Sequence, residues 1–450
     1  MTIRRALIAS TAVTAVLTLA ACSGSSGGGE AAPPASTNHK PITITMWNGF
    51  TDRELGVIDK AVEMFHASHK WITVKDTGGV DDDKIVKAIR GGNAADVTMS
   101  FSADRLGSYC ASGAWINLGS YIKRDKVDVS IFPKPSATYT TYNGTRCALP
   151  VLADVYGLYY NTDLLKKAGY TEPPKTATEL MDMAIKMTTY NGDGSIKVAG
   201  FVPSFGFYEM SPAHVAPAWG AAWQTDDGKS SFSKDPHWAA MMEWQKKFVD
   251  AIGYDKLKRF TAGAGSSEFS ASNLFETGKL AMNLDGEYRT AFIKAEHPEL
   301  KYGTAPFPVD DSQPSLYGAG YVTGNLIGIP KTTSGDAREA AWQLVKYFAT
   351  DTAVMALLSN ELRNVPTTLE ALNSSQLTPD PLFANFIKIY QNPGTSSTPV
   401  TAAGTADQDA ISAYMQKYQA GSGGDLQKGL AAVDKAVDAQ IAQSSGGAAP

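Results

Sequence analysis

Residues 42–101 have the sequence ITITMWNGFTDRELGVIDKAVEMFHASHKWITVKDTGGVDDDKIVKAIRGGNAADVTMSF, and this stretch decides the fold. It begins with residues 42–47, where apolar and polar side chains alternate with the period of two that is typical of a strand. Thr51 and Glu54 have the spacing of a capping box, which predicts that a helix begins there. Apolar side chains then recur at helical spacing, at Leu55, Ile58, Val62 and Phe65.

The same order of strand and helix repeats twice more. Residues 72–74 form the second predicted strand, and residues 81–90 form the helix that follows it. Residues 95–101 form the third strand, and a helix is expected from Asp104 to about Ala111. Connections of this length are too long for hairpins, so the three strands should lie parallel in a doubly wound α/β sheet.

Such a sheet binds its ligands beyond the carboxyl ends of its strands. Three loops follow these ends, at Trp47–Asn48, Gly78–Gly79 and Phe101–Arg105, and they should line one edge of a lobe. The sequence holds no Gly-x-x-x-x-Gly-Lys-Ser/Thr phosphate loop. The chain is therefore not expected to be an ATP-driven motor.

Composition narrows the class of protein. With 450 residues, 43% of them hydrophobic, the chain can bury more than one core. A net charge of −5 argues against nucleic-acid binding, which needs a basic face. The six His residues show no His-Glu-x-x-His pattern, so neither a metal site nor a cofactor is expected. Outside the cytoplasm, the isolated pair Cys110 and Cys147 is expected to form a disulfide.

The N-terminus predicts secretion and a lipid anchor. Arg4 and Arg5 precede an apolar run that is too short to span a membrane, so residues 1–21 are expected to be a signal peptide. The sequence Leu-Ala-Ala-Cys that ends at Cys22 resembles the bacterial lipobox, in which the new N-terminal Cys carries lipid. Residues 22–40 are rich in Ser, Gly, Ala and Pro and should be a flexible tether.

Four further stretches, taken in order, resemble the family 1 extracellular solute-binding proteins of ABC importers, which include maltose- and glycerol-phosphate-binding proteins. The stretches cover nearly the whole mature chain: Leu149–Pro150 with Gly157–Asn161, Lys167–Gly169 and Pro173–Thr176; Phe275–Lys279 with Ala281, Met282 and Gly286; Ile329–Lys331 with Ala340–Trp342 and Lys346–Phe348; and Val365–Thr367. The sequence departs from the family at Ala177, where a Trp is usual.

The resemblance implies an α/β, two-lobed periplasmic-binding-protein type II fold. Each lobe would be a mostly parallel sheet flanked by helices, with the ligand cleft between the lobes. The expected segments are 41–153 plus 322–363 for the N-lobe and 154–321 plus 364–443 for the C-lobe, with a disordered tail at 444–450.

Sugar sites combine aromatic platforms with planar polar side chains that pair adjacent hydroxyls. Asp104 and Arg105 resemble the maltose-binding segment in which an acid and a base meet sugar hydroxyls; the alternatives are a helix cap and a surface charge. Asp154 lies at the expected first crossing, where a charge in an apolar strand is costly unless it is paired or hydrated. Tyr288 falls where relatives carry a stacking Trp, although it could simply pack in the core.

Five more residues complete the expected ligand-binding set. Trp47 and Asn48 follow from the strand-end argument together with the family position. For the other three a structural role is an equal alternative: Tyr208, Tyr321 and Asn364.

The resemblance implies a monomeric, non-enzymatic, lipid-anchored protein on the outer side of the cell membrane. It would capture a carbohydrate, expected to be an oligosaccharide, by lobe closure and deliver it to ABC permease subunits. One alternative is a ligand such as glycerol phosphate, which would need cations such as Arg105, Arg289 and Arg363 in the cleft. Another is a glycoside hydrolase that uses Asp104 and Asp154 as its two carboxylates.

Overall fold

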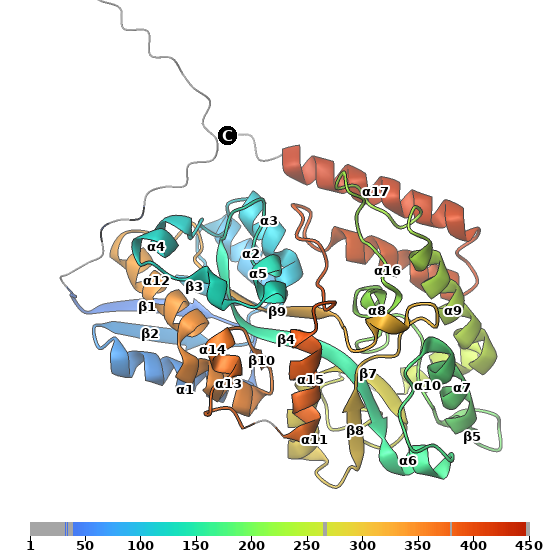
Figure 1. Ribbon diagram of the computed structural model, residues 1–450. Helices are drawn as coiled ribbons and strands as arrows, with labels where there is room; N and C mark the ends of the chain where they lie inside the picture. The colour runs from blue at the N-terminus through green and yellow to red at the C-terminus, as the bar shows by residue number, and fades with distance from the viewer. Residues whose placement is uncertain (1–31, 33, 35–38, 264–267, 379, 447–450) are drawn as a thin grey trace, which may run out of the picture.

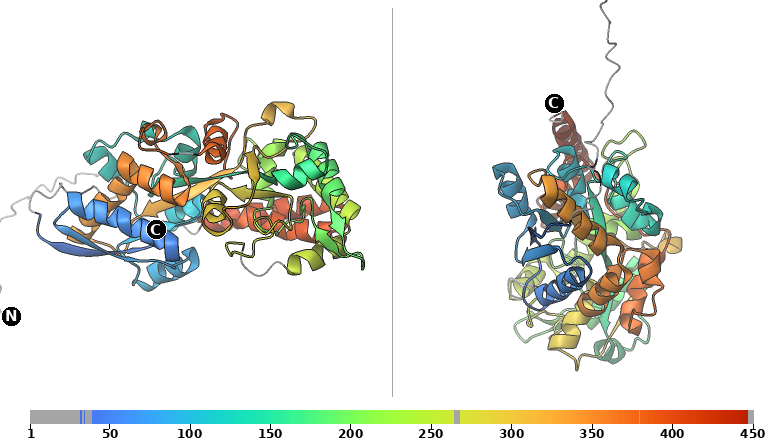
Figure 2. Two further views of the ribbon diagram at one scale, coloured as in Figure 1. Left: turned by 90° about the horizontal axis from the view of Figure 1, so that it is seen from below. Right: turned by 90° about the vertical axis from the view of Figure 1, so that its left-hand side faces the viewer.

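The computed structural model describes Ala32, Pro34 and residues 39–263, 268–378 and 380–446. The predicted signal peptide and the lipidation residue Cys22 lie outside the described residues. The chain forms two lobes that are joined by strands passing from one to the other, and Figure 2 shows the lobes end to end.

The first lobe is built on the stretch that decides the fold. Strands β1 (Ile42–Trp47), β2 (Ile72–Thr77) and β3 (Val97–Ser100) are parallel in the order β2-β1-β3, as the sequence predicts. Helices α1 (Asp52–Ser68) and α2 (Asp82–Gly91) make the crossovers. Three apolar side chains of α1 that were expected to face inward are buried in the core of this lobe: Ile58, Val62 and Phe65.

The remaining elements of the first lobe cover both faces of this sheet (Figure 1). They are η1 (Ala103–Arg105), α3 (Leu106–Ala111), α4 (Gly119–Arg124), η2 (Val129–Ile131), α5 (Lys134–Tyr139), α12 (Gly335–Thr350), α13 (Thr352–Leu362) and α14 (Leu369–Leu372).

The long strand β4 (Ala148–Asn161) links the lobes, because it changes partners along its length. Its first half pairs with β9 (Val322–Gly328) and β10 (Val365–Pro366) of the first lobe's sheet. Its second half pairs with β7 (Met282–Gly286) and β8 (Tyr302–Ala305) of the second lobe. Polar side chains near these points therefore lie between the lobes.

Helices make up most of the second lobe. They are α6 (Thr162–Lys167), α7 (Ala177–Met187), α8 (Pro212–Trp219), α9 (Pro236–Ile252), α10 (Tyr254–Ala262), α11 (Arg289–Glu296), η3 (Pro314–Leu316), α15 (Pro381–Gln391), α16 (Ala406–Gln419) and α17 (Leu426–Gly446), with a two-stranded sheet of β5 (Thr189–Tyr190) and β6 (Ile196–Val198).

The sheets are mixed rather than mostly parallel. Every pairing of β4 that the structure describes is antiparallel, and β9 is also antiparallel to β3. The α/β fold class holds, but strand direction follows from how the chain returns between the lobes, which local periodicity does not encode. The boundaries of the lobes along the chain stay a prediction.

A capping box forms at Thr176 but not at Thr51, where the sequence predicts one. Thr176 accepts a hydrogen bond from the amide of Glu179, and the Glu179 carboxylate accepts from the Thr176 amide. The Thr51 side chain makes no cap bond, so the capping box expected at Thr51 and Glu54 is wrong. Thr51 is extended, but Asp52 directly after it has a φ of 49°, so the first helical residue lacks the right-handed conformation that brings the Thr51 side chain to the Glu54 amide.

The expected disulfide is present. Cys110 in α3 and Cys147 just before β4 are bonded, with their Cα atoms 5.8 Å apart. At the other end of the chain, α17 continues to Gly446, so residues 444–446 of the expected tail are helical. Within the described ranges, no helix combines the length and the apolarity needed to cross a membrane.

Candidate functional site

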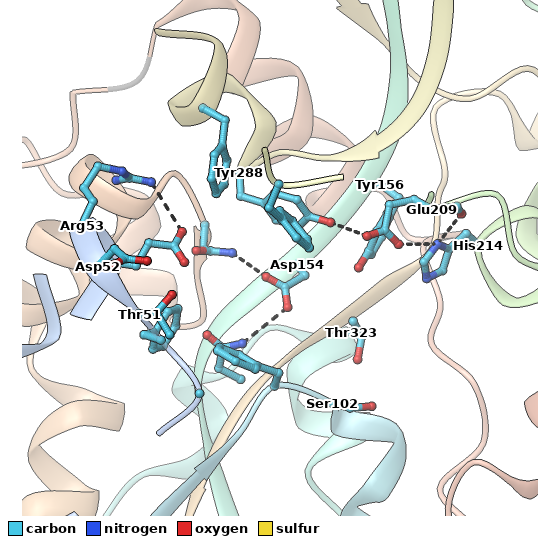
Figure 3. A pocket seen from close by; sticks show the side chains of 18 of the residues that line it. Thr51, Asp52, Arg53, Ser102, Asp154, Tyr156, Glu209, His214, Tyr288 and Thr323 are labelled. Atoms are coloured by element: carbon cyan, nitrogen blue, oxygen red, sulfur yellow. Dashed lines mark hydrogen bonds and ion pairs between the residues drawn. The ribbon is translucent and has the colours of Figure 1, made fainter. Parts of the chain in front are cut away.

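A cavity of about 710 Å³ lies between the lobes and takes side chains from both (Figure 3). The first lobe contributes the loop between β1 and α1, the loop after β3, and strands β4 and β9. The second lobe contributes residues before and within α8, Phe269, Tyr288 and helix α11 up to its last residue, Glu296. The lining includes Phe50, Thr51, Asp52, Arg53, Glu54, Phe101, Ser102, Asp104, Asp154, Tyr156, Glu209, His214, Phe269, Tyr288, Phe292, Glu296, Tyr321, Thr323, Asn325 and Asn364.

Asp104 is held by hydroxyl groups on the first-lobe side of the cavity. Tyr321 donates to both of its carboxylate oxygens at 3.1 Å, Ser102 donates at 3.2 Å, and Thr398 donates as well. Asp104 is only 8% exposed and lies within the short helix η1, so it is not the helix cap considered as an alternative. Several hydroxyl groups thus fix the carboxylate of Asp104, which lines the cavity.

Asp154 lies where β4 leaves the first lobe. The Asn364 side-chain amide donates to its carboxylate and also to Glu287, at 3.1 Å, and Asn325 donates at 3.5 Å. Glu287 is fully buried and accepts from the amide of Val155 at 2.6 Å. One amide group thus bridges two buried carboxyls at the place where three chain segments meet.

Burial favours the protonated forms of Asp154 and Glu287. It raises the pKa of Asp154, and the nearby charge of Glu209 raises it further. Burial also raises the pKa of Glu287 well above its usual range, with the charge of Asp154 as the next cause. The two carboxyls therefore hold protons to a higher pH than ordinary acids do.

Tyr288 supplies an aromatic surface from the second lobe. Its ring lies against the backbone of Gly286, where an added Cβ would come within 2.2 Å of the ring, so a larger residue at 286 would displace it. Its hydroxyl donates to Glu209 at 2.6 Å. The ring of Phe269 is 5.8 Å away, and that of Phe292 lies 5.7 Å beyond Phe269.

Two other aromatic groups complete the lining. Phe101 is 40% exposed, packs edge-on against Phe50 at 4.7 Å, and lies over Gly49. Tyr156 stacks on His214 with ring centroids 3.9 Å apart.

The structure brings five of the nine expected ligand residues together at this cavity, and four lie elsewhere. The five are Asp104, Asp154, Tyr288, Tyr321 and Asn364. Among the other four, Trp47 is half-buried against the core, and Arg105 forms an ion pair with Asp83 at 3.0 Å. Tyr208 accepts a hydrogen bond through its hydroxyl from the amide of Leu274.

Asn48, the fourth, is fully buried and fixes its own loop. Its amide donates to Asp76 at 2.8 and 2.9 Å, and its carbonyl accepts from the amide of Phe50. The strand-end argument identified the correct loop, but the loop turns so that residues 49–54 face the cavity.

Sequence reasoning missed Glu209, His214, Thr51, Phe101 and Asn325 as cavity residues. Phe101 lies in an expected loop, and Glu209 follows the predicted Tyr208, so both were one step away in the sequence. Asn325 sits in an apolar strand like Asp154, and the same cost of burying a polar group would have identified it.

Residues 60–385 match the family described as "Bacterial extracellular solute-binding protein". The chain belongs to this family. It is 23% identical to the maltotriose-binding protein of Pyrococcus abyssi over 78% of this chain and 72% of the relative. It is 24% identical to a maltooligosaccharide ABC transporter solute-binding lipoprotein of Streptococcus pneumoniae serotype 4, over 86% of each chain.

Solved structures agree with the fold of this solute-binding protein. A binding protein solved with mannotriose superposes with a TM-score of 0.77 at 25% identity, covering 88% of this chain and 99% of the other. The maltose/maltodextrin-binding domain from Bdellovibrio bacteriovorus, bound to maltotriose, superposes with a TM-score of 0.71 at 23% identity, covering 89% and 100%. The two-lobed α/β fold is thereby confirmed.

Membership of the family settles the class of activity. The solute-binding protein binds rather than transforms its ligand, so the hydrolase alternative falls although Asp104 and Asp154 share one cavity. The cations needed by a phosphorylated ligand are not in place either. Arg289 is buried in ion pairs with Asp285 and Glu276 at 2.8 and 3.1 Å, and Arg105 and Arg363 are not among the lining residues.

Proposed function

We propose that this solute-binding protein captures an oligosaccharide between its lobes and delivers it to an ABC importer. The observation that carries the proposal is the make-up of the cavity: aromatic rings and hydrogen-bonding carboxyl and amide groups face one space from both lobes. Sugars present apolar ring faces and ring hydroxyls, so they match this mixture. The relatives named for maltotriose and maltooligosaccharides support the same class of ligand.

The expected contacts are Asp104 and Asp154 from the first lobe and its crossing strand, and Tyr288 from the second lobe. Tyr321 and Asn364 hold these carboxylates in place through their hydrogen bonds. A ligand that touches both walls binds the closed arrangement of the lobes better than the open one, and so it shifts the population toward closure.

The lipid anchor belongs to the same proposal. Thioether-linked lipid at Cys22, together with the tether that follows, would keep the protein at the outer face of the membrane next to its permease. Replacing Cys22 by Ala should release the protein into the medium or leave it uncleaved, without altering its affinity for sugar. If the variant were processed normally and stayed bound to membranes, the anchor would be refuted.

Isothermal titration of the purified protein against glucose, maltose, maltotriose and mannotriose tests the proposal. A trisaccharide should bind more tightly than the monosaccharide, because a cavity of about 710 Å³ can contact several sugar rings. Thermal unfolding should shift upward with the same ligands, since they bind only the folded form. Absence of binding by any mono- or oligosaccharide, including aminated ones, would refute the proposal.

A further inference from the structure

The walls of the cavity carry an excess of negative charge. Six carboxyl groups line it, whereas Arg53 is the one Arg or Lys side chain among its described lining residues. Arg53 is itself engaged, by Glu54 at 3.5 Å and by the backbone carbonyl of Glu361 at 2.9 Å. The six carboxyl groups belong to Asp52, Glu54, Asp104, Asp154, Glu209 and Glu296.

Several hydrogen-bond donors of the cavity, including those around Asp154, are committed to these carboxyl groups. Asn364 and Asn325 donate to Asp154. Tyr288 donates to Glu209 at 2.6 Å, and Tyr321 and Ser102 donate to Asp104. The atoms of these side chains that stay available to a ligand are therefore mainly acceptor oxygens.

Asn325 provides an independent observation. This side chain lines the cavity and is 2% exposed, yet its carbonyl oxygen has no hydrogen-bond partner among the described residues. A buried acceptor without a partner is costly unless a donor reaches it. Asn325 lies beside Asp154, to which its amide donates, so the unused acceptor and the carboxylate lie next to each other.

The excess of acceptor oxygens indicates which kind of ligand group would fit this part of the cavity. A sugar hydroxyl brings one donor and two acceptor lone pairs, and beside Asp154 the amides of Asn364 and Asn325 are already engaged. A protonated amino group brings three donors, no acceptor, and a positive charge. It is also attracted to aromatic faces, of which Tyr288 and Tyr156 lie close by (Figure 3).

We propose that the ligand is an oligosaccharide bearing a primary amino group, and that the amino group sits between Asp154, Asn325 and Glu209. This inference rests on the proposed function and names the substrate class within it. Figure 3 shows Asp154, Tyr288 and Glu209 around one space, with Glu209 anchored by Tyr288 and by His214. Asp154 and Glu209 line the same cavity, so one cation between them can interact with both.

Titration with a trimer of glucosamine and with the same trimer fully N-acetylated tests the inference, because acetylation removes the charge and two of the three donors; the acetyl group that it adds is absent from maltotriose and mannotriose, which control for its bulk. At low salt and near-neutral pH, where a bound cation favours the ionised form of Asp154, the amine form should bind about tenfold or more tightly than its acetylated form, and than maltotriose or mannotriose. Added salt should narrow the difference.

A variant pair assigns the effect to the cavity. Glu209→Gln should reduce the preference for the amine form severalfold, whereas Glu243→Gln, at an exposed position on α9 of the same lobe, should leave it unchanged. Equal or tighter binding of a neutral trisaccharide would overturn the inference and leave the proposed function standing. Failure of every saccharide, aminated or neutral, would refute both.

Discussion

Replacing Asp154 by Asn removes one negative charge from the cavity and keeps the size of the side chain. The new amide oxygen can still accept from Asn364, so the crossing of β4 should keep its geometry. A ligand group that donates to Asp154 loses a charge-assisted hydrogen bond, which contributes about 1.5–3 kcal/mol. The dissociation constant for the sugar that binds most tightly should therefore rise about 10- to 100-fold.

The same change should alter how stability depends on pH. Asp154 and Glu287 have higher pKa values in the folded protein than in the unfolded chain. At any pH between these two pKa values, the folded state therefore binds more protons than the unfolded state. Their contribution to the free energy of unfolding is therefore fully present at low pH, and it is lost as the pH rises through the pKa values of the folded state. Asp154→Asn removes one of these groups and lowers the pKa of Glu287, since the charge of Asp154 no longer opposes ionisation.

The fall in unfolding free energy with rising pH should accordingly be shallower in the variant, by up to about 1.4 kcal/mol per pH unit for the group removed, with a further change in the same direction from the lowered pKa of Glu287. Urea unfolding between acid and mildly alkaline pH measures this slope, and isothermal titration measures affinity. Asp285 and Asp407 also have raised pKa values, but they are present in both proteins, so the difference isolates the Asp154 pair.

Asp83→Asn is the matched control, because Asp83 is an exposed carboxylate of the same lobe outside the cavity. It should change neither the affinity nor the slope. Unchanged affinity in Asp154→Asn would refute its role as a ligand contact. A slope equal to that of the natural protein would refute the account of the buried carboxyl pair.

Three further changes have outcomes that follow from single contacts. Tyr288→Ala should weaken sugar binding by about 1–3 kcal/mol through lost ring contact, and Tyr288→Phe should weaken it by less, as isothermal titration would measure. Equal affinity in the natural protein and both variants would contradict the stacking role. Replacing both Cys110 and Cys147 by Ser should lower the unfolding free energy by about 2–4 kcal/mol in urea, and an unchanged midpoint would contradict a stabilising disulfide. Thr176→Val should cost about 1 kcal/mol of stability through its lost cap, whereas Thr51→Val should cost little; the reverse order would contradict the observed caps.

The sequence by itself determined the elements whose causes are local. Alternation in residues 42–47 and helical spacing after it predicted β1 and α1, because burial of one face needs only the right period. The cap at Thr176 also depends on close neighbours, because its partner lies three residues away, whereas the same spacing at Thr51 gives no cap once Asp52 adopts a left-handed turn. Counting cysteines predicted the pairing of Cys110 with Cys147, as no other partner remained.

Tertiary structure decided which of the candidate polar residues face one space. Asp104 is held by Tyr321, 217 residues away along the chain, and Asp154 by Asn364, 210 residues away. Trp47 looked equivalent to its neighbours in sequence, yet the turn after β1 directs residues 49–54 rather than Trp47 to the cavity. Local patterns carry no information on such directions, because the cavity exists only where three separate crossings of the chain bring the two lobes together.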